Sequence, residues 1–159
     1  MKPRTRSRLV AFQFLYRLDL TQRLQTFTSV DWTQANGLAG EVTTHLEHFE
    51  VPEVSRNYAT QIIAHALSQL PRIDDLIESA ADHWRLERMT PVDRNLLRVG
   101  IAEVECSPDL ALPIILDETI ELGKQFGSED TRRFINGILD AIGNQIRGTS
   151  SSRSSPPTA

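Results

Sequence analysis

Apolar side chains recur at every third or fourth position over most of the chain, which is the spacing that lines one face of an α-helix. The clearest case is 52–70, whose apolar face consists of Val54, Tyr58, Ile62, Ala66 and Leu70. The same spacing predicts helices over about 5–20, 73–84, 91–106, 113–126 and 129–142. No run alternates strictly between apolar and polar residues, as a half-buried strand does. The pattern therefore predicts an all-α bundle of about six or seven helices.

The ends of the predicted helices carry recognisable signals. Thr90 can cap a helix, Pro91 suits the first helical position, and Asp93 places an acid in the first turn. Gly127 is expected to end the preceding helix in a left-handed conformation. Gly100 lies within a helix, where glycine costs about 1 kcal/mol against alanine. We therefore expect a close contact between helices at Gly100.

Two segments give weaker patterns. Residues 21–50 are expected to form one or two short helices, which Gly37 and Gly40 interrupt. Residues 148–159 hold no large apolar residue and are expected to be a disordered tail rich in serine and proline. The folded domain is therefore expected to span 1–147.

Charge is distributed unevenly along the chain. The 159 residues include 17 Lys and Arg against 21 Asp and Glu, so the net charge is −4. Residues 1–23 contain six cations and one acid, Asp19, and therefore carry +5, which leaves −9 for 24–159. A basic end on an acidic body indicates a protein that contacts a polyanion at one place. The alternative is a basic end that only improves solubility or is disordered.

Membrane and secreted proteins are disfavoured. The longest uncharged apolar run, Leu110–Leu116, is far shorter than the roughly 20 residues of a membrane span. The basic N-terminus leads into no continuous apolar core of the kind that a secretory signal has. The single cysteine, Cys106, cannot form an internal disulfide. We therefore expect a cytoplasmic protein in which Cys106 is a small buried side chain.

No group of residues predicts catalysis. His45 and His48 are three positions apart, but only Glu41 and Glu47 lie nearby as further ligands, so we expect surface histidines and no metal site. The chain has neither a P-loop nor a dinucleotide-binding glycine motif. We expect no cofactor and no enzymatic activity.

Four segments resemble one known family. Residues 89–98 match a Ser/Thr-Pro-Val-Glu/Asp-Arg pattern that an aliphatic helix follows, and 11–16 match Ala-x-Gln-x-Leu-Tyr. Residues 115–127 resemble Asn-Glu-Ala-(Val/Ile)-Glu-Leu-Ala-Lys-x-Phe-Gly, and 128–140 resemble Glu-Asp-x-x-x-Phe-(Val/Ile)-Asn-Gly-(Val/Ile)-Leu-Asp. These are patterns of the NusB family of transcription antitermination factors, and the resemblance covers about 4–142.

The resemblance implies both a fold and a function. The fold is about seven helices in two small packed bundles. The family binds the boxA element of nascent ribosomal RNA transcripts together with NusE, a small-subunit ribosomal protein. The pair joins other Nus factors on RNA polymerase and regulates whether transcription passes terminators. This sequence departs from the pattern at Asp117 and Thr119, where Asn and Ala are usual. The free protein could be a monomer or a homodimer, since both occur in the family.

Two sets of candidate site residues follow. Cations at the N-terminus suit RNA phosphates, and the turn before the last helix suits splayed bases. The RNA-binding candidates are Lys2, Arg4, Arg6, Arg8, Lys124, Phe126, Gly127, Asp130 and Arg133. The candidates for binding NusE, which is expected to be basic, are Tyr16, Glu87 and Asp93. Core packing for Phe126, and helix capping for Asp130 and Asp93, stay open as alternatives.

Two other functions remain open at this point. The same kind of helical domain occurs at the front of some ribosomal RNA cytosine methyltransferases, but this chain contains no methyl-donor domain, so that function requires a longer reading frame. The chain could also be a helical interaction module without RNA binding. An RNA titration with and without the basic N-terminus separates that case from an antitermination factor.

Overall fold

The computed structural model describes residues 1–24 and 37–154, and within them it contains seven α-helices, one short 3₁₀ helix and no strand. Residues 25–36 and 155–159 lie outside the described residues, so the parts of the predictions for 21–50 and for the tail that fall there are not addressed. The all-α prediction is confirmed. In chain order the elements are α1 (Pro3–Leu20), α2 (Leu38–His48), α3 (Glu53–Ser68), α4 (Leu70–Ala80), η2 (Leu86–Arg88), α5 (Pro91–Cys106), α6 (Leu112–Phe126) and α7 (Glu129–Ser154).

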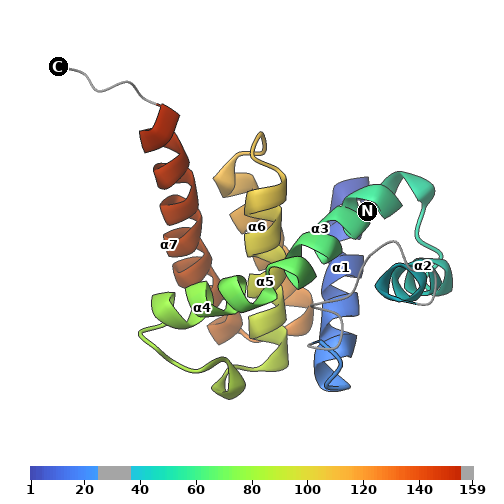
Figure 1. Ribbon diagram of the computed structural model, residues 1–159. Coiled ribbons are helices and arrows are strands. Elements are labelled where there is room, and N and C mark those ends of the chain that lie inside the picture. Colours follow the sequence, from blue (N-terminus) through green and yellow to red (C-terminus); the bar gives the residue numbers. More distant parts are fainter. Residues whose placement is uncertain (25–36, 155–159) are drawn as a thin grey trace.

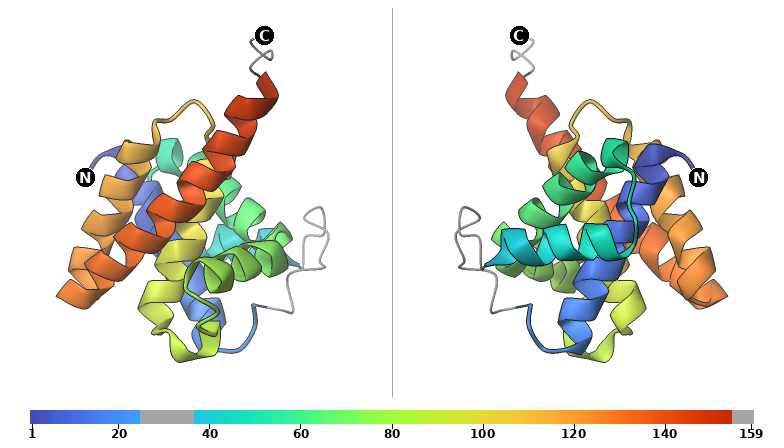
Figure 2. Two further views of the ribbon diagram at one scale, coloured as in Figure 1. Left: turned by 90° about the vertical axis from the view of Figure 1, so that its left-hand side faces the viewer. Right: turned by 90° about the vertical axis from the view of Figure 1, so that its right-hand side faces the viewer.

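The helices form two groups that share α5. In one group α1 packs against α2 and α3, and in the other α5, α6 and α7 pack against one another (Figure 1). Both α1 and α3 contact α5, and α4 lies across α5 and α7. The two groups therefore enclose one continuous hydrophobic core. Figure 2 shows α2 on the opposite side of the molecule from α7.

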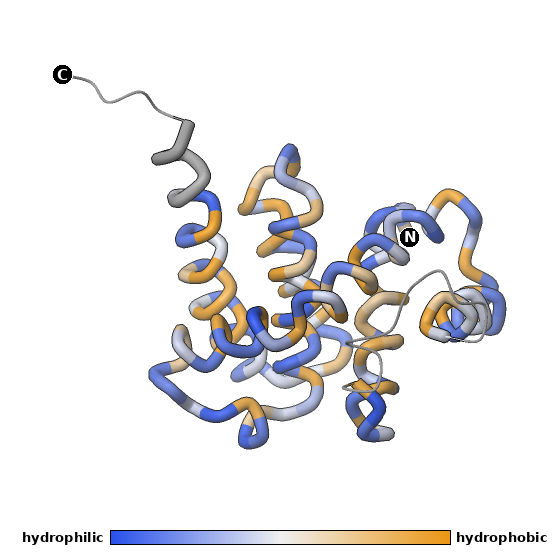
Figure 3. Tube along the Cα trace, in the orientation of Figure 1, coloured by the Kyte–Doolittle hydropathy of each residue, from blue (hydrophilic) through white to orange (hydrophobic). Residues whose placement is uncertain are grey.

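The sequence explains why α5 is central. Its residues from Asn95 to Val104 are all buried, so the helix has neighbours on every side. Most other helices are amphipathic, and the trace alternates between apolar and polar residues within single helices (Figure 3). Thr90 caps α5 as predicted, because its hydroxyl accepts a hydrogen bond from the Asp93 backbone N–H at 3.0 Å. Asp93 therefore does not serve as the cap itself.

At the two weak segments the structure fits the sequence predictions only in part. The described part of 21–50 contains a single helix, α2, which includes Gly40. The last helix, α7, continues to Ser154, past the boundary at 147 that the sequence predicts for the folded domain, and the disorder of the tail stays a prediction. Extending a helix restricts the backbone of one residue for each hydrogen bond gained, whereas starting a helix restricts several residues for the first hydrogen bond. A helix that is already packed can therefore continue past its last apolar residue, and α7 projects beyond the body of the molecule (Figure 1).

His45 corrects the expectation of surface histidines. It is 1% exposed and packs between the rings of Phe14 and Phe49, at centroid distances of 5.2 and 4.7 Å. Burial, together with the positive charge of Arg17, lowers the pKa of His45 to about 4. His45 is therefore a neutral core residue at neutral pH.

None of the described helices is long and apolar enough to cross a membrane.

The predicted close contact at Gly100 is confirmed. A Cβ atom at this position would lie 2.8 Å from Cδ2 of Leu139 and 3.3 Å from Oγ1 of Thr119. Leu139 is completely buried and has little room to move. By contrast, a Cβ atom at Gly137, also on a helix, would meet nothing within 4 Å.

These two glycines give a matched test of packing. Replacing Gly137 with alanine should stabilise the protein by about 0.5–1 kcal/mol, because alanine restricts the unfolded chain. Gly100→Ala receives the same benefit but overfills the core, which typically costs about 1–3 kcal/mol, so we expect a net loss of about 1 kcal/mol. Urea denaturation of the two variants measures the difference. Equal stability of both variants would show that α5 and α7 are not in close contact.

Candidate nucleic-acid interface

The exposed cations of the N-terminus lie at the start of α1. Lys2 and Arg4 are exposed and Arg6 is half-buried. The guanidinium of Arg4 lies 5.1 Å from the ring centroid of Tyr58, and Nη2 of Arg6 donates to the carbonyl of Phe49 at 3.0 Å. These contacts are with a ring and a carbonyl, so they orient the arginines without neutralising them. The positive charge stays available to an anion such as phosphate.

Arg8 does not belong to this exposed group, which corrects the prediction that it contacts RNA. Its side chain is 3% exposed, and Nε donates to both carboxylate oxygens of Glu103 at 2.7 and 2.9 Å. A second ion pair joins Nη1 to Glu118 at 3.4 Å. Burial opposes the charged form, but the bonds to Glu103 outweigh it and raise the pKa of Arg8. Tyr58 also donates to Glu103, which completes a buried polar cluster.

The sequence held a signal for the burial of Arg8. It precedes Phe12 by four residues and Leu15 by seven, so it lies on the apolar face of α1. Both Phe12 and Leu15 are buried. A cation at such a position needs a buried acid, and Glu103 supplies it from the all-buried stretch of α5.

At the turn between α6 and α7, the ring of Phe126 and the backbone of Gly127 are exposed. Phe126 is 40% exposed, so it is not a pure core residue, and its ring centroid lies 5.1 Å from that of Phe12. Gly127 is extended, at φ −120° and ψ −168°, and the predicted left-handed conformation is wrong. The glycine is needed for another reason: a Cβ atom there would lie 2.5 Å from Oγ1 of Thr131. Lys124 is exposed and pairs with Glu121 at 2.7 Å.

Ser128 and Thr131 cap the start of α7. The Thr131 N–H donates to Oγ of Ser128 at 3.4 Å, and the Ser128 N–H donates to Oγ1 of Thr131 at 3.2 Å. This reciprocal arrangement leaves the side chain of Asp130 outside the cap. Asp130 is exposed, and so is Arg133 one turn further along α7. Both side chains are therefore accessible to a ligand.

A row of aromatic rings connects the turn to the predicted partner surface. The ring of Phe12 lies between Phe126 and Tyr16, at centroid distances of 5.1 and 5.7 Å. Tyr16 is half-buried on α1. The RNA-binding candidate Phe126 and the partner-binding candidate Tyr16 therefore lie on neighbouring parts of one surface.

A network of charged side chains holds α1 against the start of α5. Asp19 of α1 accepts hydrogen bonds from Arg94 at 2.6 and 3.0 Å and from Asn95 at 2.8 Å. Arg98 joins Asp19 at 3.2 Å and Asp74 of α4 at 2.8 Å. Burial raises the pKa of Asp74, whereas for Asp19 the bonds from Arg94 and Asn95 outweigh burial and lower the pKa. The network fixes the start of α5, and hence Asp93, relative to Tyr16.

A cavity of about 440 Å³ opens beside this network. It is lined by Trp84, Arg88, Met89, Thr90, Asp93, Asp130, Arg133 and Phe134, and we call it the Trp84 pocket. It brings Asp93, a partner-binding candidate, next to Asp130 and Arg133, which are RNA-binding candidates. Glu87 is exposed on η2 nearby and does not line the pocket.

The sequence did not predict this pocket, because the spacing of its two aromatic residues is that of core residues. Trp84 and Phe134 both continue apolar stripes, yet Trp84 is 49% exposed and Phe134 only partly buried. Trp84 follows Asp82 and His83 and precedes Arg85. These polar neighbours indicate that Trp84 lies where the apolar face of the helix ends, so that its ring can be exposed.

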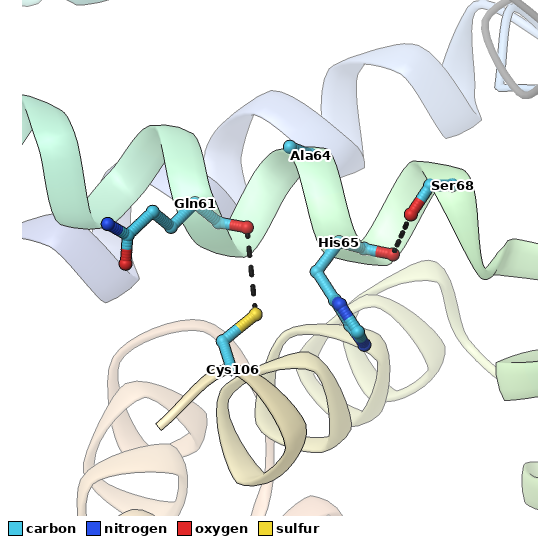
Figure 4. A pocket seen from close by; sticks show the side chains of 5 residues that line it. All are labelled: Gln61, Ala64, His65, Ser68 and Cys106. Atoms are coloured by element: carbon cyan, nitrogen blue, oxygen red, sulfur yellow. Dashed lines mark hydrogen bonds between the residues drawn. The ribbon is translucent and has the colours of Figure 1, made fainter. Parts of the chain in front are cut away.

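A second cavity, of about 470 Å³, lies between α3 and α5 and holds none of the predicted site residues (Figure 4). Cys106 lies on its wall, partly exposed rather than buried as expected, with Sγ 3.7 Å from the carbonyl oxygen of Gln61. His65 faces the same cavity and contacts Glu105 at 3.0 Å. Hydrogen bonds to Cys106 and Glu105 raise the pKa of His65 to about 9. No group of three or more metal-ligating side chains occurs within the described ranges.

The fold and these exposed groups define a class, namely all-helical proteins of two packed helical groups with a basic N-terminus and an exposed aromatic residue at the turn before the last helix. Residues 5–144 match the model of the NusB family, and the chain belongs to that family. The family resemblance drawn from the sequence motifs is therefore confirmed.

Relatives and solved structures agree with this membership. Transcription antitermination protein NusB of Koribacter versatilis is 34% identical over 90% of each chain. The protein of the same name from Myxococcus xanthus is 34% identical over 89% of this chain and 95% of its own. A crystal structure of antitermination factors NusB and NusE with double-stranded RNA matches at a TM-score of 0.73 and 26% identity, covering 91% of this chain and 98% of that chain. The structure of T. maritima NusB matches at a TM-score of 0.72 and 29% identity, covering 91% of this chain and 92% of that chain.

The different environments of Arg8 and Arg4 can be tested by stability. Arg8→Gln leaves the Glu103 carboxylate buried without its cation, and breaking a buried pair in this way typically costs about 3–5 kcal/mol. Arg4→Gln changes an exposed side chain and should alter the free energy of unfolding by less than about 0.5 kcal/mol. Thermal or urea denaturation of the two variants measures this. If both variants are as stable as the wild type, Arg8 is not buried against Glu103 in solution.

Proposed function

We propose that this protein is a transcription antitermination factor that binds boxA-type single-stranded RNA of nascent ribosomal RNA transcripts together with NusE. It acts within the elongating RNA polymerase complex with other Nus factors, by binding and not by catalysis, and hence in the cytoplasm. The observation that carries the proposal is that α1 has exposed cations at its start and contacts the exposed ring of Phe126 through Phe12, in a member of the NusB family. Exposed cations and an exposed ring are the two elements that bind single-stranded RNA, by phosphate contacts and by base stacking.

The RNA would run from the start of α1 to the start of α7. Exposed cations contact phosphates, Phe126 stacks on a base, and the carboxylate of Asp130 accepts hydrogen bonds from base N–H groups. Gly127 lets the strand approach the backbone closely. The proposed RNA-contacting residues are Lys2, Arg4, Arg6, Lys124, Phe126, Gly127, Asp130 and Arg133. Arg8 is left out because it is buried.

The partner protein would bind beside the RNA, on the surface that includes Tyr16, Glu87 and Asp93. Residues 24–159 carry −9, which suits a basic ribosomal protein. The structural relative in which NusB is bound to NusE and RNA supports two partners on one protein of this fold. Because Asp93 shares a pocket with Asp130, RNA and partner would contact each other as well as this protein. Each should then raise the affinity for the other by the same factor.

The RNA-binding part of the proposal is tested by salt dependence. In the double variant Arg4→Gln/Arg6→Gln, two phosphate contacts are lost, so the slope of log affinity against log salt should fall by about 0.7 for each contact. Fluorescence anisotropy with a boxA-like single strand at several salt concentrations measures the slope. Arg72→Gln is the control, because Arg72 lies on α4 and pairs with Glu105. An unchanged slope in the double variant would show that RNA binds elsewhere.

The partner-binding part is tested by association kinetics. Glu87 is 79% exposed, so Glu87→Gln removes a surface charge without disturbing the core. We expect slower association with the NusE partner at low salt, and a difference that shrinks as salt screens the charges. Stopped-flow mixing measures the rate. Asp109→Asn removes an exposed acid beyond the other end of α5 and should leave the rate near the wild-type value. If the two variants slow association equally, the partner does not dock near Glu87.

A further inference from the structure

Tyr58 on α3 contacts an exposed cation of α1 from a half-buried position. Cζ of the Arg4 guanidinium lies over its ring, 5.1 Å from the ring centroid. Arg4 is exposed, and a long exposed side chain without such a contact moves among many rotamers. The face of an aromatic ring attracts a cation electrostatically. The contact therefore restricts a surface arginine that the proposed function assigns to an RNA phosphate.

The ring of Tyr58 is itself held from the interior of the protein. Its hydroxyl donates a hydrogen bond to Oε2 of Glu103 and lies 2.9 Å from Oγ of Ser107. Glu103 is buried and paired with Arg8. Burial and the hydrogen bond to Glu103 raise the pKa of Tyr58 to about 12, so the hydroxyl remains a donor at neutral pH. The buried polar cluster thus fixes the ring that Arg4 contacts.

The backbone at the start of α1 is also held by α3. Oγ of Ser55 donates to the carbonyl of Pro3 at 2.9 Å, and Oγ of Ser7 donates to the carbonyl of Ser55 at 2.8 Å. Both serines are buried. Ser55 and Tyr58 lie about one turn apart on α3. The same helix therefore fixes the backbone next to Arg4 and the position of its guanidinium.

An arginine can contact a ring and a phosphate at the same time. It contacts the ring through the planar face of the guanidinium, whereas a phosphate is bound by the N–H groups at the edge. A side chain that is already held loses less rotamer freedom when the ligand binds, so the affinity is higher. We propose that Tyr58 is a positioning residue for RNA binding, which holds the Arg4 guanidinium ready for a phosphate without contacting the RNA itself. This inference rests on the proposed function, whereas the helical spacing of 52–70 predicts only a core ring at Tyr58.

Two substitutions of Tyr58 separate its ring from its hydroxyl. Tyr58→Phe and Tyr58→Leu both lose the hydrogen bonds to Glu103 and Ser107, so both should be less stable than the wild type, but only Tyr58→Leu loses the ring. We expect Tyr58→Leu to weaken binding of a boxA-like single strand by about two- to fivefold, the size of one exposed contact between a cation and a ring. Tyr58→Phe should bind nearly as tightly as the wild type.

Fluorescence anisotropy measures these affinities, at a temperature where circular dichroism shows that all variants are folded. Ser107→Ala is a further control, because it removes a partner of the Tyr58 hydroxyl and leaves the ring in place. If Tyr58→Phe and Tyr58→Leu weaken RNA binding equally, the hydroxyl and not the ring matters, and the positioning role is wrong.

A double-mutant cycle tests whether Tyr58 acts through Arg4. In an Arg4→Gln background, Tyr58→Leu should cause no further loss of RNA affinity, because the side chain that it positions is already absent. Arg6→Gln is the matched background: Nη2 of Arg6 is bonded to the carbonyl of Phe49 and not to the ring, so Tyr58→Leu should keep its full effect there. A merely structural role of Tyr58 predicts the same loss in all backgrounds, and that result would overturn the proposal.

The contact can also be observed in the free protein. The ring current of Tyr58 should shift the side-chain NMR signals of Arg4. This shift should persist in Tyr58→Phe and disappear in Tyr58→Leu. Identical Arg4 signals in the wild type and both variants would show that the contact does not exist in solution, and the proposal would be wrong.

A failure of this inference differs from a failure of the proposed function. If the boxA-like strand binds the wild type and the cycle shows no coupling between Tyr58 and Arg4, the positioning role is wrong and the proposed function stands. If the strand does not bind the wild type, the RNA-binding function is wrong, and the positioning role falls with it even where the NMR shift of Arg4 is present.

Discussion

The buried ion pairs between α1 and α5 are the constraint on which the rest of the structure depends. Arg8 is paired with Glu103 near one end of α1, and Asp19 is paired with Arg94 and Arg98 near the other. Moving these charges out of water costs several kcal/mol per ion, so the pairs are tolerable only in one exact arrangement of the helices. Leucine side chains at the same places could slide past one another with little penalty. The ion pairs therefore fix the rotation and register of α1.

That fixed register determines what the surface of α1 presents. With Arg8 turned inward, Arg4 lies three residues before Ser7, where the buried stretch of α1 begins, and remains exposed. With Asp19 tied to α5, Tyr16 lies beside Phe12 and the Phe126 turn. A single rigid helix thus presents cations at one end and an aromatic surface at the other. Proteins that must hold RNA and a protein partner together benefit from such rigidity, because neither ligand then has to order the site before binding.

The sequence predicted the helices well and their special residues less well. Helical periodicity and caps located every long helix among the described residues, because both depend on short stretches of chain. The burial of Arg8 and of His45 depends on acids and rings that other helices supply, and a single-helix pattern does not contain them. Gly127 was identified as a required glycine for the wrong reason: its constraint is the approach of Thr131, not a positive φ. The candidate RNA and partner residues came from the charge asymmetry and the family motifs, neither of which shows which arginine is buried.

The Trp84 pocket shows why the remainder of the site could not be predicted. Its walls come from two segments that are far apart in sequence: residues 84–93, which run from the stretch after α4 through η2 into the start of α5, and residues 130–134 at the start of α7. In each place alone, the residue has an ordinary explanation, such as a cap acid for Asp93 or a core ring for Phe134. Only the packing of α4, α5 and α7 brings two acids, two arginines and a half-exposed indole around one cavity. Because Thr90 and Ser128 already cap the two helices, neither Asp93 nor Asp130 is needed for capping, and both acids are free to bind a ligand.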